Sequence, residues 1–228
     1  MKKMHNIAVI LAGGIGSRVG GNTPKQLLPL ADGRSVLEHA VDAFEASPYI
    51  DEIVVVMHPD YIQKLQKLCH SNHWQKLTKL IPGGAERWES TYTAVSQLSP
   101  FNFQLSTPAL LLHDAARPFV SQRIIAEVCQ ALETHEAVTV AVPVTDTLYR
   151  TEDNQVCEIP DRSRFMRAQT PQAFRLPVIA EAFRRAMKEG NIAATDDVGI
   201  LRRYMPEIPV FIVPGEETNR KITYREDL

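Results

Sequence analysis

The sequence predicts an α/β fold built on a twisted, mostly parallel β-sheet, with one β-arm that projects from it. Short apolar runs, partly β-branched, alternate along the chain with segments of helical periodicity. This alternation is the pattern of parallel strands and their crossover helices. One stretch, at about 145–168, breaks the alternation, and no linker or shift in composition divides the 228 residues. We therefore expect a single domain, 1–228, that carries an arm.

The first half of the chain contains three expected strands and three expected helices. Residues 7–11 (IAVIL) are a continuous apolar run that ends in glycines, as a buried parallel strand does. Segment 34–47 predicts a helix, because Ser35 and Glu38 fit a capping box ahead of one apolar face. Beyond it the same reasoning predicts a strand at 52–59, a helix at 61–68, a strand at 77–84 and a helix at 86–98.

The second half continues the alternation and contains the exception. The run PALLLHD within 108–119 predicts a strand that enters a charged loop, and Ser121 fits the N-cap of a helix over 121–135. Further elements are expected as a strand at 137–144, a helix at 177–190 that stops at Gly190, and a last strand at 208–215. Between them, about 145–168 alternates roughly around a polar turn at 152–155. That pattern predicts a β-hairpin, the arm.

Charge, hydropathy and cysteine content exclude several classes of function. The formal net charge is −2 and no basic–aromatic interleaving is present, which excludes a general nucleic-acid surface. The apolar run near the N-terminus, about seven residues, is too short to span a bilayer. The cysteines, at 69, 129 and 157, lack CxxC or metal-like spacing. Without a secretory signal they predict reduced core thiols in a cytoplasmic protein.

Polar clusters follow the predicted strands at the points where the strands end. GGIGSRVGGNTPKQ follows the first, GGAERWEST the third, HDAARP the fourth and GEETNRK the last. In open α/β sheets, ligands bind beyond the carboxyl ends of the strands. We therefore expect these clusters to converge on one site.

The loop after the first strand has the composition of an anion site. Gly13, Gly14 and Gly16 let the backbone approach a ligand closely, and Arg18 and Lys25 add two positive charges. GxGxxG is not met, because valine stands at the third glycine's place, and no Walker A string is present. The loop therefore predicts nucleotide phosphates held by backbone amides and two cations in another geometry. The alternative is a glycine-rich turn with solvated charges.

The string HDAARP places three polar side chains at the end of the fourth strand. Asp114 can bind a ribose hydroxyl or a metal, and Arg117 can bind phosphate. The alternative is a surface Asp–Arg ion pair. We expect His113 to be a packed strand-end residue rather than a catalyst. The sequence shows no Ser/His/Asp set and no zinc spacing.

Taken in order, the strings LAGGIGSR, PKQ, GG-ER--S, HDAARP, PVTDT, DRS, QTPQAF, TDD and NRKIT--EDL resemble those of the 2-C-methyl-D-erythritol 4-phosphate cytidylyltransferase family. The resemblance runs from about residue 6 to the end. It implies a Rossmann-like nucleotidyltransferase domain whose β-arm pairs two subunits. It also implies transfer of CMP from CTP to 2-C-methyl-D-erythritol 4-phosphate, with release of pyrophosphate, in isoprenoid precursor synthesis.

Two alternatives to this function stay open. Ribitol-5-phosphate cytidylyltransferases share most of these strings, so the same chemistry on ribitol 5-phosphate or another sugar-alcohol phosphate is the nearer one. A nucleotide-binding regulator without turnover is the second, and it would need Arg18 or Lys25 to be absent or misplaced. Two departures from the family bear on the substrate: Ala85 stands where an acid is frequent, and Tyr149 where lysine is common.

The resemblance also assigns roles by position. The implied catalytic cations are Arg18, Lys25 and Lys221. The implied CTP-binding residues are Leu11, Ala12, Gly13, Gly14, Gly16, Gly84, Ser90, Asp114 and Ala115. The implied binders of the second substrate are Arg117, Thr147, Arg162 and Thr195, of which Thr147 and Arg162 would reach the partner subunit's site in a homodimer. The implied cofactor is Mg²⁺ or another divalent cation, held mainly by CTP phosphates rather than by protein ligands.

Overall fold

The structure, a computed structural model, describes residues 4–14, 23–99, 107–190, 192 and 194–228. Within these residues seven strands form the main sheet, in the order β3-β2-β1-β4-β8-β5-β9. Their bounds are β1 (Asn6–Ala12), β2 (Glu52–Met57), β3 (Leu77–Pro82), β4 (Ala109–Asp114), β5 (Ala137–Pro143), β8 (Met166–Arg175) and β9 (Phe211–Pro214). The six strands expected from the sequence are all confirmed, and β8 is the addition.

The sheet is mostly parallel with one reversed strand. β1 pairs in parallel with β2 and β4, β2 with β3, and β5 with β9. β8 lies antiparallel between β4 and β5 and joins the two parallel groups. The hairpin expected at about 145–168 was placed too far toward the C-terminus at its second boundary. Residues from Met166 onward belong to β8, and Met166 pairs with Pro143 in the main sheet.

Six α-helices are present in the described part of the chain: α1 (Val36–Glu45), α2 (Ile62–Asn72), α3 (Arg87–Leu98), α4 (Gln122–Ala131), α5 (Leu176–Glu189) and α6 (Asp197–Tyr204). The expected caps are confirmed. Ser35 and Glu38 form the capping box of α1, the Ser121 side chain caps α4, and Gly190 ends α5 with a positive φ of 77°. α6 was not expected from the sequence.

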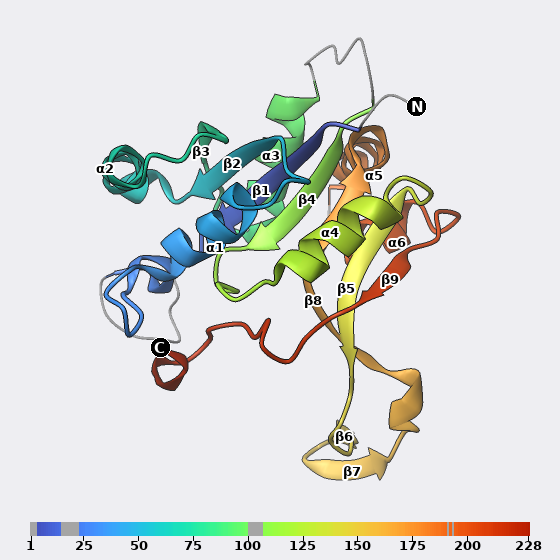
Figure 1. Cartoon of the computed structure of the whole chain (residues 1–228). Helices are drawn as coiled ribbons and strands as arrows, with labels where there is room; N and C mark the ends of the chain where they lie inside the picture. Colours follow the sequence, from blue (N-terminus) through green and yellow to red (C-terminus); the bar gives the residue numbers. More distant parts are fainter. Residues whose placement is uncertain (1–3, 15–22, 100–106, 191, 193) are drawn as a thin grey trace.

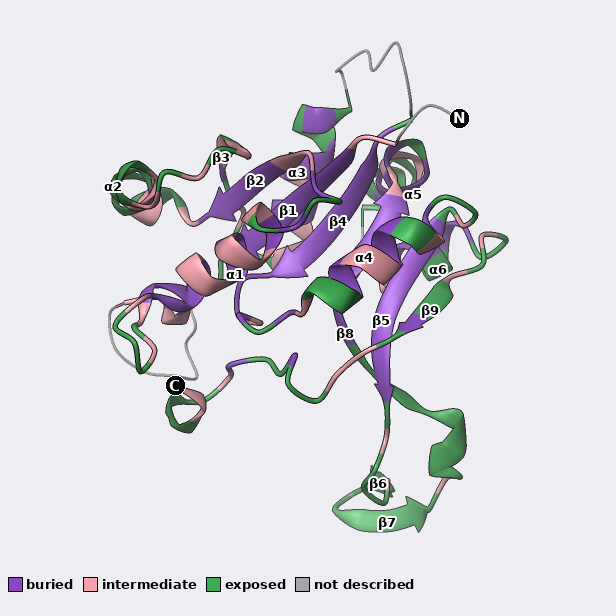
Figure 2. Cartoon of the chain, viewed as in Figure 1, coloured by how far each residue is buried: buried purple, intermediate pink, exposed green. Residues whose placement is uncertain are grey.

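The helices cover both faces of the sheet and bury alternate strand residues (Figure 1). On β1, Ala8 and Ile10 face a core shared with α1, α2 and α4, whereas Ile7 and Val9 face a core shared with α3, α5 and α6. The inner strands β1, β2, β4 and β5 are the most continuously buried part of the molecule (Figure 2). Burial of each large aliphatic side chain stabilises the fold by about 1.5–3 kcal/mol. The two cores therefore hold the strands, and with them the strand ends, in place.

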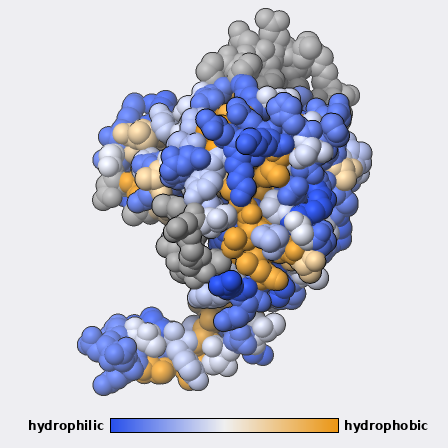
Figure 3. All heavy atoms as spheres, turned by 90° about the vertical axis from the view of Figure 1, so that its left-hand side faces the viewer, coloured by the Kyte–Doolittle hydropathy of each residue, from blue (hydrophilic) through white to orange (hydrophobic). Residues whose placement is uncertain are grey.

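The arm is a separate two-stranded sheet, β6 (Arg150–Glu152) and β7 (Gln155–Glu158). The turn residues Asp153 and Asn154 both have positive φ, 48° and 61°, as a two-residue hairpin loop requires. The arm stands away from the sheet and is exposed throughout (Figures 1 and 2). Apolar side chains on the arm and at its base are exposed to solvent (Figure 3): Tyr149, Val156, Ile159, Phe165 and Met166. The predicted hairpin is therefore confirmed.

The three cysteines are free thiols in different surroundings. Cys129 is buried and Cys69 is half-buried, but Cys157 is exposed on β7, so the expectation of a core position was wrong for that residue. It fails because the arm has no core of its own. Across the described residues, no helix combines the length and the hydropathy needed to cross a bilayer.

Candidate active site

A cavity of about 280 Å³ lies beyond the carboxyl ends of β1 and β4, against the loop that follows β3. Eight of the residues that the sequence singled out line it: Leu11, Gly13, Gly14, Lys25, Gly84, Ser90, Asp114 and Lys221. The other lining residues are Gln26, Ala85, Glu86, Arg87, Ala116 and Thr223. Because parallel strands end at one edge of the sheet, loops far apart in sequence meet here.

The loops after β1 and β3 pack closely against each other. A Cβ atom on Gly13 would lie 2.8 Å from Ser90 Oγ, so a larger residue there would displace the Ser90 hydroxyl. The Ser90 hydroxyl accepts a hydrogen bond from the Gly84 amide at 3.2 Å and so joins the second loop to α3. One wall of the cavity is therefore backbone, held at a fixed separation.

A short 3₁₀ helix, η1 (Lys25–Leu27), brings the predicted lysine to the cavity. The neighbouring Gln26 is buried and donates to the carbonyl oxygens of Ala12 at 3.3 Å and Gly14 at 2.9 Å. Lys25 Nζ donates to the Ile222 carbonyl at 2.7 Å. The N-terminal loop and the C-terminal segment thus meet at this ammonium group.

The C-terminal segment is anchored before it reaches the cavity. Asn219 is fully buried, and its amide donates to Gln169 Oε1 at 3.1 Å and to the Thr170 carbonyl at 2.9 Å. Two residues later Lys221 enters the cavity wall, and the Ile222 amide donates to the Ala116 carbonyl at 2.8 Å. The segment runs from β9 along the sheet edge to the loop before α1 (Figure 1).

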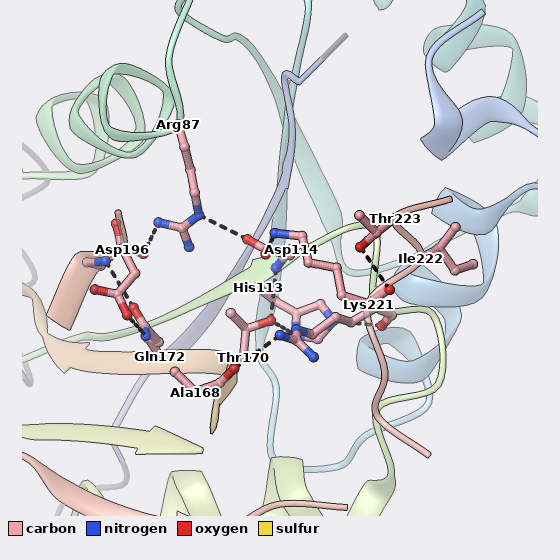
Figure 4. A network of polar contacts seen from close by, with 12 residues as sticks. Arg87, His113, Asp114, Ala168, Thr170, Gln172, Asp196, Lys221, Ile222 and Thr223 are labelled. Carbon is pink, nitrogen blue, oxygen red and sulfur yellow. Dashed lines mark hydrogen bonds and ion pairs between the residues drawn. The ribbon is translucent and has the colours of Figure 1, made fainter. Parts of the chain in front are cut away.

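Asp114, at the end of β4, lies between two cations (Figure 4). Its Oδ1 is 3.0 Å from Arg87 Nε and its Oδ2 is 2.6 Å from Lys221 Nζ. Burial opposes ionisation of this carboxyl group, but the charges of Arg87 and Lys221 outweigh burial and hold the pKa of Asp114 well below its usual range. The carboxylate is therefore charged at neutral pH.

Arg87 also binds a second buried carboxyl group, that of Asp197, whose pKa is raised because burial outweighs the charge of Arg87. Arg87 Nη1 lies 2.8 Å from Oδ2 of Asp197, which is fully buried in the first turn of α6. Gln172 on β8 fixes this turn, because its Oε1 accepts from the Asp197 and Val198 amides while its Nε2 donates to Asp196 Oδ2 (Figure 4). Sequence reasoning missed Arg87 as a site residue, although it stands in the string GG-ER--S.

His113 is buried beside the cavity, as expected. Its Nε2 lies 2.9 Å from the Arg117 carbonyl and must donate to it, because a carbonyl can only accept. In the neutral ring the other nitrogen, Nδ1, then accepts from the Thr170 hydroxyl at 3.1 Å. The same hydroxyl accepts from the Asp114 amide at 3.1 Å. Burial lowers the pKa of His113 to about 4, so the ring is neutral at pH 7.

The four residues expected to bind the second substrate do not line the cavity. Arg117 is half-buried and donates to the carbonyls of Asn219 at 2.7 Å and Ala168 at 3.2 Å. Thr147 and Arg162 are exposed at the base of the arm, and Thr195 is exposed just before α6.

The remaining predicted residues lie behind the cavity or outside the described part. Ala12 and Ala115 are fully buried, and neither is part of the lining. The Ala115 amide donates to the Leu11 carbonyl at 3.0 Å, which ties the ends of β4 and β1 together. Gly16 and Arg18 lie outside the residues that the structure describes.

Comparison with known proteins places this geometry in one family. The model of the IspD family, 2-C-methyl-D-erythritol 4-phosphate cytidylyltransferase, matches residues 6–228. The enzyme of that name from Thermobifida fusca is 45% identical over 226 residues, covering 97% of this chain and 89% of the relative. A bifunctional ribulose 5-phosphate reductase/CDP-ribitol pyrophosphorylase from Haemophilus influenzae is 36% identical, over 100% of this chain and 48% of its own length.

Solved structures agree in fold. The crystal structure of 4-diphosphocytidyl-2C-methyl-D-erythritol synthase from Anaerococcus prevotii superposes with a TM-score of 0.84 at 28% identity, covering 99% of this chain and 93% of that one. The corresponding structure from Francisella tularensis gives a TM-score of 0.79 at 27% identity, over 98% and 96%.

Proposed function

The chain belongs to the 2-C-methyl-D-erythritol 4-phosphate cytidylyltransferase family, and on that premise we propose how its cavity carries out the reaction. The enzyme transfers CMP from CTP to 2-C-methyl-D-erythritol 4-phosphate, releases pyrophosphate and serves the non-mevalonate isoprenoid pathway. One observation carries the proposal for the site: Lys25 and Lys221, from opposite ends of the chain, line a single cavity at the carboxyl edge of the sheet.

We infer that CTP lies along the glycine loops. The backbone wall formed by Gly13, Gly14 and Gly84 suits the triphosphate and the base, with Ser90 fixing the second loop. Asp114 accepts a ribose hydroxyl, since each carboxylate oxygen has a second lone pair beyond the cation it already binds. Gly16 and Arg18 complete the phosphate loop in this proposal.

The chemical step needs charge compensation rather than proton removal. An oxygen of the second substrate's phosphate attacks the α-phosphorus of CTP, and the bond to pyrophosphate breaks as the new P–O bond forms. The attacking oxygen is already anionic, so no general base is required. Lys25, Lys221 and Arg18 offset the repulsion between the two anions and the charge that gathers at the α-phosphorus.

A divalent cation fits this site through the nucleotide. The described residues contain no group of three or more His, Cys, Asp or Glu side chains that could hold a metal ion, and both Asp114 oxygens already bind cations. Magnesium sites of this kind rely on substrate phosphates and water with few protein carboxylates. Mg²⁺ would supply charge neutralisation on the pyrophosphate leaving group.

The identity of the second substrate can be tested directly. We propose that Arg117, Thr147, Arg162 and Thr195 bind its phosphate and hydroxyls. The CDP-ribitol relative makes ribitol 5-phosphate the alternative substrate. In a pyrophosphate-release assay with CTP and Mg²⁺, we expect kcat/KM for 2-C-methyl-D-erythritol 4-phosphate to exceed that for ribitol 5-phosphate by at least about 10-fold, because the acceptors differ both in a branching methyl group and in the length of the hydroxylated chain.

The Lys25→Ala protein serves as the control for contaminating activity in that assay. A preference for ribitol 5-phosphate would leave the proposed CTP site unchanged, but would contradict the assignment of 2-C-methyl-D-erythritol 4-phosphate as the second substrate. No pyrophosphate release with either acceptor would contradict the proposed use of the cavity.

We further propose that the arm pairs two copies of the chain. Val156 and Ile159 are 54% and 63% exposed, although aliphatic side chains of this size are stabilised by burial. Pairing through the arm would bring Thr147 and Arg162 to the partner's cavity. Light scattering at micromolar concentration is expected to give the mass of two chains, and Val156→Asp with Ile159→Asp the mass of one, with activity lost. A wild-type monomer with full activity would contradict both points.

A further inference from the structure

The resting contacts of Lys221 raise a difficulty for the proposed reaction. Its ammonium group is bound to Asp114 at 2.6 Å, and the Asp114 side chain is only 11% exposed. A buried carboxylate attracts a cation more strongly than one in water. If Lys221 were its sole counter-charge, Asp114 would compete with the phosphates of CTP for the same ammonium group.

Arg87 relieves this competition by its position. It binds the other oxygen of Asp114 at 3.0 Å, so the carboxylate keeps a cation when Lys221 turns to a phosphate (Figure 4). Arg87 is 26% exposed at its side chain, whereas Lys221 is 39% exposed and extends from the C-terminal segment. The arginine is thus the more enclosed partner and the lysine the more accessible one.

The fixed position of Arg87 is built from two further elements. Asp197 binds Nη1 at 2.8 Å, so the planar guanidinium spans two carboxyl groups in one orientation, which a lysine cannot reproduce. Asp197 in turn belongs to a helix start held by Gln172 and capped by Asp196. Arg87 is therefore held between two carboxyl groups from different elements, next to the more accessible Lys221.

We propose that Arg87 is a positioning residue for Lys221: by sharing the charge of Asp114, it leaves the Lys221 ammonium group available to the phosphates during transfer. This rests on the proposed catalytic role of Lys221. Arg87 acts through Asp114 and is not assigned a contact with the reacting atoms.

A double-mutant cycle tests the proposal. Values of kcat are measured at saturating CTP and 2-C-methyl-D-erythritol 4-phosphate for wild type, Arg87→Met, Lys221→Met and the double variant. We expect Arg87→Met to lower kcat on the order of ten-fold in the wild-type background, because Asp114 then retains Lys221. In the Lys221→Met background it should change kcat by less than about two-fold, since residues that act as a unit are not additive.

Controls separate this role from a purely structural one. Arg184→Met removes an arginine that pairs with Glu181 on α5, away from the cavity, and should leave kcat unchanged. Arg87→Lys keeps a positive charge near Asp114 but loses the fixed orientation of the guanidinium, so its kcat should fall less than that of Arg87→Met. Thermal unfolding of each protein establishes which variants are folded, and Arg87→Gln, which also removes the charge, takes the place of Arg87→Met in the cycle if Arg87→Met is not folded.

Three outcomes would overturn the proposal. An equal loss of kcat from Arg87→Met in both backgrounds would mean that Arg87 acts independently of Lys221. A loss of kcat in folded Arg87→Lys as large as that in Arg87→Met would mean that the positive charge beside Asp114 is not what matters. Full activity of Lys221→Met would contradict the proposed role of Lys221 and the inference together. A low kcat in Lys221→Met, with the same further loss from Arg87→Met as in the wild-type background, would contradict the inference alone and leave the role of Lys221 intact.

Discussion

Replacing Lys25 by alanine is expected to lower kcat by about 10²–10³-fold, the loss typical of removing one preorganised charge contact to a transition state. The lysine lies at the start of η1, where Gln26 fixes the loop after β1 through two backbone carbonyls. The residue lines the cavity, and its ammonium group is held there by the Ile222 carbonyl at 2.7 Å. The same loss is expected for Arg18→Ala.

The measurement is pyrophosphate release at saturating substrates, together with thermal unfolding. Lys25→Ala removes the hydrogen bond to the Ile222 carbonyl, so a loss of about 1 kcal/mol in the free energy of unfolding accompanies it. Lys64→Ala, on the exposed surface of α2, is the matched control and should leave kcat unchanged. Near-normal turnover of folded Lys25→Ala would contradict the assignment of this cavity as the site of transfer.

Apart from the exposed arm, the elements that the sequence predicted are largely those whose stability comes from apolar burial. β1 and β4 read as strands because their apolar runs enter the two cores. β8 contains buried Gln169, Thr170 and Gln172 in place of such a run. These polar groups are tolerated because each is hydrogen-bonded to a segment distant in sequence, such as Asn219 or the start of α6. Nothing in the local pattern reveals partners of that kind.

α6 was missed for a related reason. Its eight residues include a glycine and two arginines, and its first turn buries Asp197 rather than an apolar side chain. The turn is held by the Gln172 side chain, by the Asp196 cap and by the contact between Asp197 and Arg87. Two of these partners come from distant segments, and such contacts leave no periodic signal in the local sequence.

The sequence predicted the part of the candidate site whose position follows from the topology of the sheet alone. Parallel strands end at one edge, so the loops that contain Gly13, Gly84 and Asp114 had to meet. The cluster GEETNRK, which ends at Lys221, was expected at this edge by the same rule, whereas the catalytic role of Lys221 rested on family resemblance. Its exact position depends on the anchored C-terminal segment. Arg117 and Thr195 stay outside the cavity wall, and their placement against a second substrate remains a proposal.

The second large effect is expected in the pH dependence of folding. His113 has a pKa of about 4 in the folded protein, against an ordinary value of 6.5, because burial penalises the charged ring. Between these values the unfolded chain binds a proton that the folded chain does not. The free energy of unfolding therefore rises with pH in this window and falls as pH decreases.

The size of the effect follows from the two pKa values. Between pH 7 and pH 5 the His113 contribution lowers the free energy of unfolding by about 2 kcal/mol, and below the folded pKa the loss approaches about 3 kcal/mol. A change of 2 kcal/mol alters the folding equilibrium about 30-fold. Chemical denaturation at the two pH values measures it.

His113→Gln isolates this contribution, because an amide can both donate and accept but does not titrate near neutral pH. At pH 7 the variant loses part of the packing and hydrogen bonding to Arg117 and Thr170. Its difference in stability between pH 7 and pH 5 should nevertheless be about 2 kcal/mol smaller than that of wild type. His70→Gln, on the exposed surface of α2, should keep the wild-type difference. If the difference in the free energy of unfolding between pH 7 and pH 5 were the same in His113→Gln as in wild type, groups other than His113 would govern acid sensitivity. The hydrogen bond from the Thr170 hydroxyl to a neutral His113 ring would then contribute nothing to that pH dependence.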